Sequence, residues 1–391
     1  MRRKVRFTRF DLGLALLGVL LVVVCAFLVQ MSNLMISPPR PRISTSTRPI
    51  LGVALRETND GAVLVERAFG PAARAGLEAG DRIVRLDGLD SPSIEEFSSA
   101  VTSAPAGTAF TVEARRPLPN GIDSGILLKA ESEARAISPA EEGVPFETVA
   151  FPNPAGLTLR GWYVPAPASV RERAPAVVYG HGNGSDRRQW LPLARRVHER
   201  GIAQLFLDFA GRGDSDGDVI TLGAREAGDL VAGIDWLARR PEVDPDRIAA
   251  AGKSMGAVAA ILAASRDPRI RVLVLDSPFA DLGDVVDRAV RRRHLPPALL
   301  RPVIFRVAGW RASFDPASLV PERAIAEVVV PALLLHGEED GLVPIEHARR
   351  LAGAAKGPVT LVPLAGEGHN TRRSRDTLDR VARYLEGSLA R

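Results

Sequence analysis

Cysteine is almost absent from this sequence, because Cys25 is the only one among 391 residues. A single thiol excludes an intramolecular disulfide, so the folded parts must be held together by burial of apolar side chains. It also excludes a thiol nucleophile or a thiolate metal site after Cys25. The six histidines do not show the His-x-x-x-His or carboxylate spacing of metal ligands. We therefore expect neither a metal nor another cofactor.

Excess basic charge is missing from most of the chain. The net charge is +5, but residues 1–10 hold five basic residues and no acid, which leaves 46 basic and 46 acidic residues in the remainder. Nucleic-acid binding therefore has no support, since it needs clustered basic side chains. The local run Arg291-Arg292-Arg293-His294 is interpreted as one solvated helix face.

Charge is absent altogether from residues 12–29, which read LGLALLGVLLVVVCAFLV. Eighteen apolar residues approach the length needed to cross a hydrocarbon core of roughly 30 Å. A cleaved signal peptide would have a shorter apolar core and an Ala-x-Ala-like site, which CAFLVQMSNLM does not offer. We therefore predict an uncleaved transmembrane anchor over residues 1–31.

The flanking charges of this anchor predict its orientation. Five basic residues precede the span, whereas three lie in the twenty residues after it (Arg40, Arg42 and Arg48). The amino terminus is therefore expected in the cytoplasm, and the rest of the chain outside the cell membrane, in a periplasmic or extracellular space. Residues 32–49, rich in Pro, Ser and Thr, are predicted to be a linker.

Residues 50–130 change to short β-type runs separated by turn residues, with a helix predicted over SIEEFSSAVTS. Their motifs are Leu51-Gly52-Val53, Ala75-Gly76-Leu77, Gly80-Asp81-Arg82-Ile83 and Asp87-Gly88. This segment resembles a PDZ domain of the type found in periplasmic proteases. The resemblance implies that a peptide or protein C-terminus pairs with the strand starting at Val53, its carboxylate held near Leu51 and Gly52. The alternative is a structural spacer with an empty groove.

Residues 131–144 are predicted to be a second linker, and residues 145–391 alternate strand and helix patterns. Six apolar runs are expected as strands: PAVVYGHG, AQLFLDF, RIAAAG, RVLVLDS, VPALLLHG and TLVPL. Continuous apolar strands with amphipathic helices between them predict a doubly wound, mostly parallel sheet in the α/β class.

Ser254 is the candidate nucleophile. It lies in Gly252-Lys253-Ser254-Met255-Gly256, after an apolar strand and before an Ala-rich helix. Two glycines permit the sharp turn that exposes a serine hydroxyl, and the helix amino terminus favours developing negative charge. Lys253 is expected either to be exposed or to raise the local positive potential.

A serine nucleophile also needs a base and an orienting acid. Asp340 and His369 each follow an apolar strand, in the chain order Ser, Asp, His. Glu339 and Asp276 are alternative acids. The whole segment 145–391 resembles the α/β-hydrolase family, in which Asp340 and His369 occupy the acid and base positions.

The same resemblance implies an oxyanion hole formed by the backbone N–H groups of Asn183, in His181-Gly182-Asn183-Gly184, and of Met255. Arg212-Gly213-Asp214 invites an adhesion interpretation, but it fits the family's loop after the fourth strand, which Asp208 is expected to order. Residues 280–329 are a candidate cap and acyl pocket, or else a plain packed helix pair. Its spaced apolar residues are Leu282, Leu295, Leu299, Ile304, Phe305, Trp310 and Phe314.

These features predict a membrane-anchored serine hydrolase that cleaves ester or thioester bonds of a small-molecule or lipid acyl substrate through an acyl-enzyme. One alternative is a serine peptidase guided by the PDZ-like module. The other is a non-catalytic peptide-binding scaffold, whose mark would be a broken Ser-His-Asp set.

Overall fold

The computed structural model describes residues 48–390 apart from 51–52, 59–61, 69, 104–107, 118–122, 132, 136–137 and 171. The described chain forms two compact units, which meet in sequence between Ser138 and Pro139. The predicted anchor at 1–31, and Leu51 and Gly52 of the predicted peptide groove, lie outside the described residues. Among the helices that are described, none is long and apolar enough to cross a membrane.

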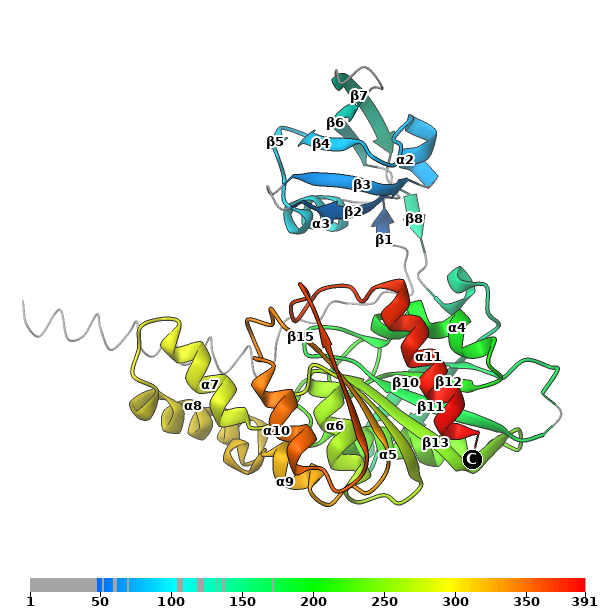
Figure 1. Ribbon diagram of the computed structural model, residues 1–391, viewed down its shortest axis with the longest axis vertical. Coiled ribbons are helices and arrows are strands. Elements are labelled where there is room, and N and C mark those ends of the chain that lie inside the picture. The colour runs from blue at the N-terminus through cyan, green and yellow to red at the C-terminus, as the bar shows by residue number, and fades with distance from the viewer. Residues whose placement is uncertain are drawn as a thin grey trace, which may run out of the picture. The chain divides into compact units, whose positions relative to one another are not determined.

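The N-terminal unit is built on an antiparallel sheet with the strand order β2-β3-β4-β6-β7, and a short β5 pairs with β4 (Figure 1). The strands are β2 (Val53–Glu57), β3 (Val63–Ala68), β4 (Arg82–Leu86), β5 (Leu89–Asp90), β6 (Ala109–Pro117) and β7 (Asp123–Glu131). Two helices accompany them, α2 (Gly70–Ala75) and α3 (Ile94–Ser103).

Local sequence explains α3. Ser93 Oγ accepts the N–H of Glu96, and Glu96 Oε2 accepts the N–H of Ser93, so the predicted cap is a reciprocal capping box. The inner face of the helix buries Phe97 and Val101 in a core shared with the strands, including Val112 of β6. Burial of these apolar side chains orders the unit without a disulfide.

Both predicted linkers contain regular structure. β1 (Arg48–Ile50) pairs antiparallel with β8 (Glu133–Arg135), and the short 3₁₀ helix η1 (Pro139–Glu142) follows. β1 therefore lies at the end of the predicted linker 32–49, while β8 and η1 lie inside the predicted linker 131–144. Strands of three residues carry no readable alternation, which is why the sequence pattern missed them.

The C-terminal unit is built on an eight-stranded sheet with the order β16-β15-β14-β13-β11-β12-β10-β9. All six predicted strands are present and parallel. Two further strands at one edge, β9 and β10, are antiparallel and were not predicted. The strands are β9 (Glu147–Pro152), β10 (Thr158–Val164), β11 (Ala174–Gly180), β12 (Ala203–Asp208), β13 (Val243–Lys253), β14 (Ile270–Asp276), β15 (Ala332–Gly337) and β16 (Val359–Leu364).

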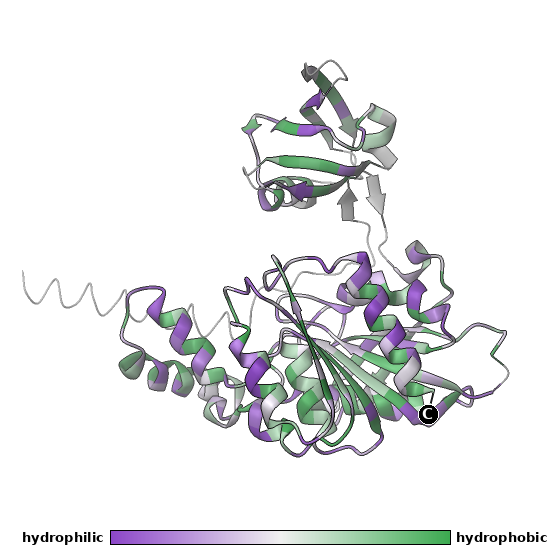
Figure 2. Cartoon of the chain, viewed as in Figure 1, coloured by the Kyte–Doolittle hydropathy of each residue, from purple (hydrophilic) through white to green (hydrophobic). Residues whose placement is uncertain are grey.

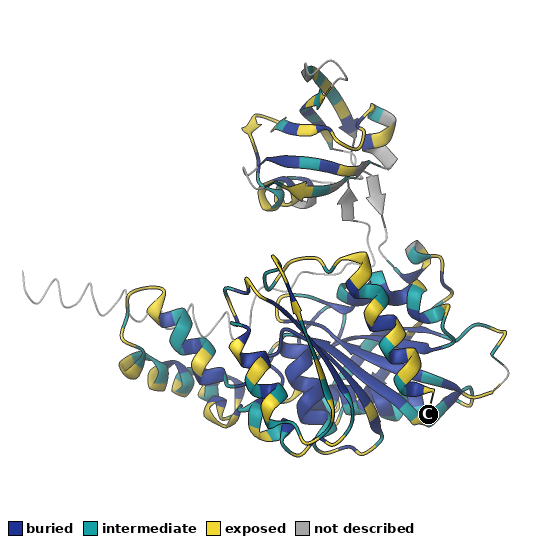
Figure 3. Ribbon diagram, in the orientation of Figure 1, coloured by how far each residue is buried: buried dark blue, intermediate teal, exposed yellow. Residues whose placement is uncertain are grey.

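Helices cover both faces of this sheet (Figure 1). α4 (Ala194–His198) and α11 (Arg375–Leu389) pack together on one face. On the other face α5 (Glu226–Ala238) packs on α6 (Met255–Ala264), and α9 (Pro321–Ile325) packs on α10 (Glu346–Ala354). The central strands are buried from both sides (Figure 3), which explains their continuous apolar sequences.

The candidate cap forms a helix pair. α7 (Leu282–Arg291) packs against α8 (Pro297–Ala312), and the short η3 (Pro316–Ser318) follows. Leu282 and Ile304 are buried in the core, whereas Leu299 and Trp310 are 70% and 82% exposed. The predicted apolar residues therefore do not converge on one enclosed acyl pocket.

Candidate active site

Ser254 lies on a strained turn between β13 and α6. Its backbone has φ 51° and ψ −115°, which is rare for a residue with a side chain. A Cβ on Gly252 would lie 2.1 Å from the Gly256 carbonyl oxygen, and a Cβ on Gly256 would lie 2.2 Å from that of Gly180. Only glycine fits at both positions, so the Gly-x-Ser-x-Gly spacing is a steric requirement of this turn.

The structure brings Ser254, His369 and Asp340 together. His369 Nε2 lies 3.0 Å from Ser254 Oγ, and His369 Nδ1 lies 2.6 Å from Asp340 Oδ2. The three residues follow β13, β15 and β16 at the carboxyl edge of the parallel sheet. The candidate nucleophile, base and orienting acid are thus linked by one chain of hydrogen bonds.

Asp340 is held rigidly for its place in this chain. Its Oδ1 accepts the N–H groups of Leu342 and Val343 at 2.9 and 2.8 Å, which leaves Oδ2 to face His369. Burial raises the pKa of the Asp340 carboxyl, but hydrogen bonding and charge from His369 outweigh it, and the net pKa is lowered. Asp340 is therefore an ionised acceptor beside the imidazole at neutral pH.

Neither alternative acid faces His369. Glu339 is exposed to solvent. Asp276 is buried, and its two carboxylate oxygens accept hydrogen bonds from Arg373 at 2.5 and 2.9 Å. Of the three candidates, only Asp340 occupies the position of the orienting acid.

The predicted oxyanion loop lies against the serine. A Cβ on Gly182 would lie 3.6 Å from the Ser254 Cβ, so the turn leading to Asn183 passes beside the nucleophile. Gln189 Oε1 accepts the Gly182 N–H at 2.7 Å, and Arg212 donates to Asn183 Oδ1 at 3.2 Å. Met255 begins α6, where the N–H groups of the first turn make no intrahelical bond.

The loop after β12 is ordered as predicted. Asp208 Oδ1 accepts the Arg187 N–H at 2.7 Å, and Oδ2 accepts the Asp214 N–H at 3.0 Å. A Cβ on Gly213 would lie 2.1 Å from the Asp208 carboxylate. Arg212 is only 1% exposed, so this Arg-Gly-Asp sequence cannot present its arginine to a receptor.

Arg373 is a residue that the sequence did not point to. Besides Asp276, its guanidinium donates to Glu367 Oε2 at 2.7 Å and to Ser277 Oγ at 3.0 Å. The Asp276 carbonyl oxygen accepts the Ser254 N–H at 2.7 Å. Arg373, four residues after His369, therefore ties the loop that carries His369 to the strand end whose carbonyl oxygen holds Ser254.

Lys253 is buried rather than exposed. Burial lowers the pKa of its ammonium group, with Arg373 acting in the same direction, while Asp276, Asp340 and Glu367 oppose the shift. Of the two expectations for Lys253, exposure is wrong. Within the described residues, no group of three or more His, Cys, Asp and Glu side chains is placed to hold a metal ion.

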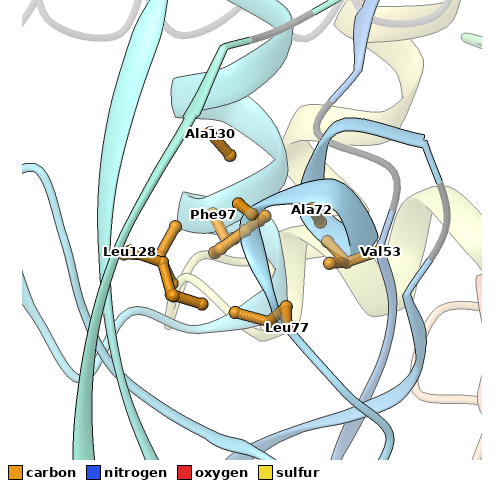
Figure 4. Close-up of a pocket in the computed structure, with 8 residues that line it drawn as sticks. Val53, Ala72, Leu77, Phe97, Leu128 and Ala130 are labelled. Atoms are coloured by element: carbon orange, nitrogen blue, oxygen red, sulfur yellow. The ribbon is translucent and has the colours of Figure 1, made fainter.

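The N-terminal unit has a small apolar pocket (Figure 4). Three labelled side chains point toward one another there: Val53 on β2, Phe97 on α3, and Leu77 in the loop after α2. Leu128 on β7 also lines the pocket. Its lining has no charged residue: Val53, Ala72, Ala75, Leu77, Phe97, Val112, Leu128 and Ala130. The pocket begins at the predicted peptide-pairing strand.

Family profiles match both units. The X-Pro dipeptidyl-peptidase (S15) family matches residues 138–297, and the prolyl oligopeptidase family matches residues 219–387. A PDZ domain profile matches residues 49–124.

Similar chains occur in distant organisms. Uncharacterized protein Rv2307c of Mycobacterium tuberculosis is 36% identical over 256 residues, which cover 64% of this chain and 82% of the relative. Uncharacterized protein YfhR of Escherichia coli K12 is 26% identical over 226 residues, covering 57% and 73%. The α/β-hydrolase domain-containing protein WAV2 of Arabidopsis thaliana is 25% identical over 244 residues, covering 59% and 74%.

Solved structures share the fold of the C-terminal unit. The Pyrococcus furiosus esterase Pf2001 superposes with a TM-score of 0.53 at 24% identity, covering 65% of this chain and 93% of the esterase. A complex of DcsB with its substrate analogue gives 0.51 at 20% identity, covering 63% and 100%. The chain belongs to the α/β-hydrolase superfamily of serine hydrolases, and a PDZ-like domain precedes its hydrolase domain.

Proposed function

We propose that the hydrolase domain cleaves ester or thioester bonds by acyl transfer to water, with Ser254, His369 and Asp340 as its catalytic triad. The observation that carries this proposal is the unbroken hydrogen-bond chain from Ser254 Oγ through His369 to Asp340 Oδ2. A serine hydroxyl needs such an adjacent base to attack a carbonyl carbon at neutral pH.

In the first half of the reaction, Ser254 Oγ forms a bond to the carbonyl carbon while His369 Nε2 accepts the serine proton. Asp340 stabilises the imidazolium and fixes its orientation. The tetrahedral intermediate collapses when the bond to the alcohol or thiol breaks, and His369 donates the proton to that leaving group. In the second half, water attacks the acyl-enzyme, His369 accepts a proton from it, and the acid is released as Ser254 recovers its hydrogen.

The oxyanion would be bound by the backbone N–H groups of Met255 and Asn183. Support comes from the position of Met255 in the first turn of α6 and from the approach of the Gly182 turn to Ser254. One such donor is typically worth about 2.7–4 kcal/mol of transition-state stabilisation. Gln189, which holds the Gly182 N–H, would keep this loop in place.

A serine peptidase is the second candidate. It is favoured by the two matching family profiles, both of which are described as peptidases, and by the adjoining PDZ-like domain. In that reaction the same three residues would cleave an amide, and the PDZ-like domain would bind a peptide by strand pairing along β2 beside Val53. Leu51 and Gly52 would hold the terminal carboxylate.

Esters and amides can be separated by substrate profiling of the full-length protein. We expect hydrolysis of p-nitrophenyl esters, with kcat/KM depending on acyl-chain length, and its loss in Ser254→Ala. Peptide p-nitroanilides should be cleaved far more slowly. A preference for the anilides would contradict the esterase proposal and favour the peptidase.

The placement of the enzyme in the cell is a separate proposal. We propose that residues 1–31 anchor the chain with the amino terminus in the cytoplasm and both domains outside the membrane. Its support is the charge asymmetry around residues 12–29. Protease added to spheroplasts should digest both domains, whereas protection of the domains would contradict this orientation.

A further inference from the structure

The helix pair α7–α8 carries a concentration of positive charge. Between Arg288 and Phe314 the sequence has seven arginines and no aspartate or glutamate, although basic and acidic residues are equal in number over residues 11–391 as a whole. Asp287 lies 3.1 Å from Arg301 Nη1 and 3.7 Å from Arg291 Nη2, so one carboxylate serves two guanidiniums. The segment therefore has a local positive potential.

Helix α8 has apolar residues on both its inner and its outer side. Ile304, Ala308 and Ala312 face the core of the domain and are buried. Leu299 and Trp310, already described as exposed, are eleven residues or three helical turns apart, and Val303 between them is 41% exposed. Figures 2 and 3 show hydrophobic and exposed residues along α8. A soluble helix normally presents polar residues on its outer side.

A hollow on this outer side adds to the apolar surface. Phe305, Trp310 and Phe314 line it together with Pro302, Gly309 and Pro316, and its charged lining residues are Arg306 and Asp315. Asp315 accepts the N–H of Ala317 and so caps η3. The outer face thus combines exposed aromatic and aliphatic groups with arginines at its margin.

The helix pair adjoins the active site. Arg288 Nε on α7 donates to the carbonyl oxygen of Gly341 at 3.1 Å, and Gly341 directly follows Asp340. α7 itself begins shortly after β14 ends at Asp276, at the same sheet edge as the triad. α8 packs on α7, so the pair lies at the side of the domain where Asp340 is held.

We infer that the outer face of α8, defined by Leu299, Val303, Arg306 and Trp310, docks on an anionic lipid surface. Tryptophan and aliphatic side chains insert at the boundary between headgroups and acyl chains, while arginines extend to the lipid phosphates. Clustered basic residues are attracted to the negative potential of such a surface. A second copy is a poor occupant, because two like faces would bring their arginines together. Arg291, Arg292 and Arg293 lie outside this face and are exposed at the end of α7, as expected for a solvated run.

Fluorescence of a single-cysteine variant tests this docking directly. In the full-length chain, Cys25→Ser removes the native thiol, and Val303→Cys is labelled with an environment-sensitive nitrobenzoxadiazole group. With vesicles of phosphatidylcholine and phosphatidylglycerol, we expect the emission to shift to shorter wavelength. The shift should be absent with phosphatidylcholine alone and should shrink in Arg306→Gln/Arg311→Gln.

The matched control is Val329→Cys, labelled in the same background. Val329 is 69% exposed and lies just before β15, at the sheet edge opposite the active site. It should show no lipid-dependent shift, even if residues 1–31 insert into the bilayer. The inference is overturned by three results: no shift at residue 303, an equal shift at residue 329, or a shift in lipid-free solution that grows with protein concentration. The last result would identify a second copy.

Discussion

Arg373 connects two segments that carry residues of the candidate site. It bridges Glu367, just before the histidine, and Asp276, whose carbonyl oxygen holds the Ser254 N–H. Both carboxylates are largely shielded from solvent, so the guanidinium also compensates buried charge. We therefore expect the His369–Ser254 distance to depend on this bridge.

Replacing Arg373 by Gln should misplace His369 relative to Ser254. We predict a kcat about 10- to 100-fold lower with KM little changed, because small errors in the placement of a base are costly in rate. Arg373→Lys should restore part of kcat. Steady-state kinetics on an ester measures this, with Arg372→Gln as the exposed control. Equal effects on kcat in the two Gln variants would contradict the positioning role.

His181 supplies a pH dependence of stability. It is fully buried, and its Nε2 accepts the Phe209 N–H at 3.2 Å, so a proton on that nitrogen would break the contact. Burial lowers the pKa of His181 from 6.5 to about 4. Between pH 4 and pH 6.5, His181 is therefore protonated in the unfolded chain and neutral in the folded protein. The stabilisation is therefore complete above pH 6.5 and is lost as the pH falls toward 4.

Over that window, His181 alone should reduce the free energy of unfolding by up to about 3 kcal/mol. All four tryptophans lie in the hydrolase domain, so urea unfolding followed by tryptophan fluorescence reports on that domain. His181→Gln should lose less stability than wild type between pH 7 and pH 5. The exposed His294→Gln should behave as wild type; a matching response of the two variants would refute the assignment.

Site residues that lie in a local sequence motif could be predicted from the sequence. Ser254 was found from its two flanking glycines, and His369 and Asp340 from their places after apolar strands. Arg373 was missed because its partner Asp276 is 97 positions away in the sequence, and no spacing rule connects them. Lys253 was ambiguous because burial of one lysine depends on packing from several elements.

The turn between β13 and α6 is the element on which the site depends. A Cβ at residue 256 would overlap the backbone of β11, a position that cannot relax without moving a central strand. Gly256→Ala should therefore destabilise the hydrolase domain by several kcal/mol or prevent its folding. Gly353, in α10, has no atom within 4 Å of an added Cβ. Gly353→Ala should be stabilising by roughly 0.5–1 kcal/mol. Thermal unfolding of both variants should show a lower Tm for Gly256→Ala and a slightly higher Tm for Gly353→Ala. Equal changes in Tm would contradict the steric explanation.

Elements with a strong periodic pattern were predicted, and irregular ones were not. The six parallel strands, α3 and α5 follow from continuous apolar runs or helical spacing. β9 and β10 were missed because polar residues interrupt their apolar ones, unlike the continuous apolar runs of the parallel strands, and β1 and β8 were missed because they are too short. For residues 280–329 the sequence did not decide between a cap with an acyl pocket and a plain packed helix pair. The spacing of apolar residues does not tell which side of α8 a neighbouring element covers.

At the scale of the whole molecule, the two domains have separate hydrophobic cores. Among the residues that the structure describes, the PDZ-like core around Phe97 shares no buried side chain with the core of the hydrolase domain. Phe97→Ala should therefore destabilise the PDZ-like domain by about 3–5 kcal/mol. The tryptophan-detected transition of the hydrolase domain should stay unchanged, and calorimetry should show only the other transition moving. Parallel shifts of both transitions would show that the domains unfold together.

The central claim, an activated serine at residue 254, is tested most directly by labelling the full-length protein with a fluorophosphonate probe. The account predicts that wild type is labelled, that Ser254→Ala is not, and that His369→Ala is labelled much more slowly, since the base is lost while the nucleophile remains. Labelling that persists in Ser254→Ala would place the reactive group elsewhere. A folded wild-type protein that fails to react would contradict the claim and favour a peptide-binding scaffold.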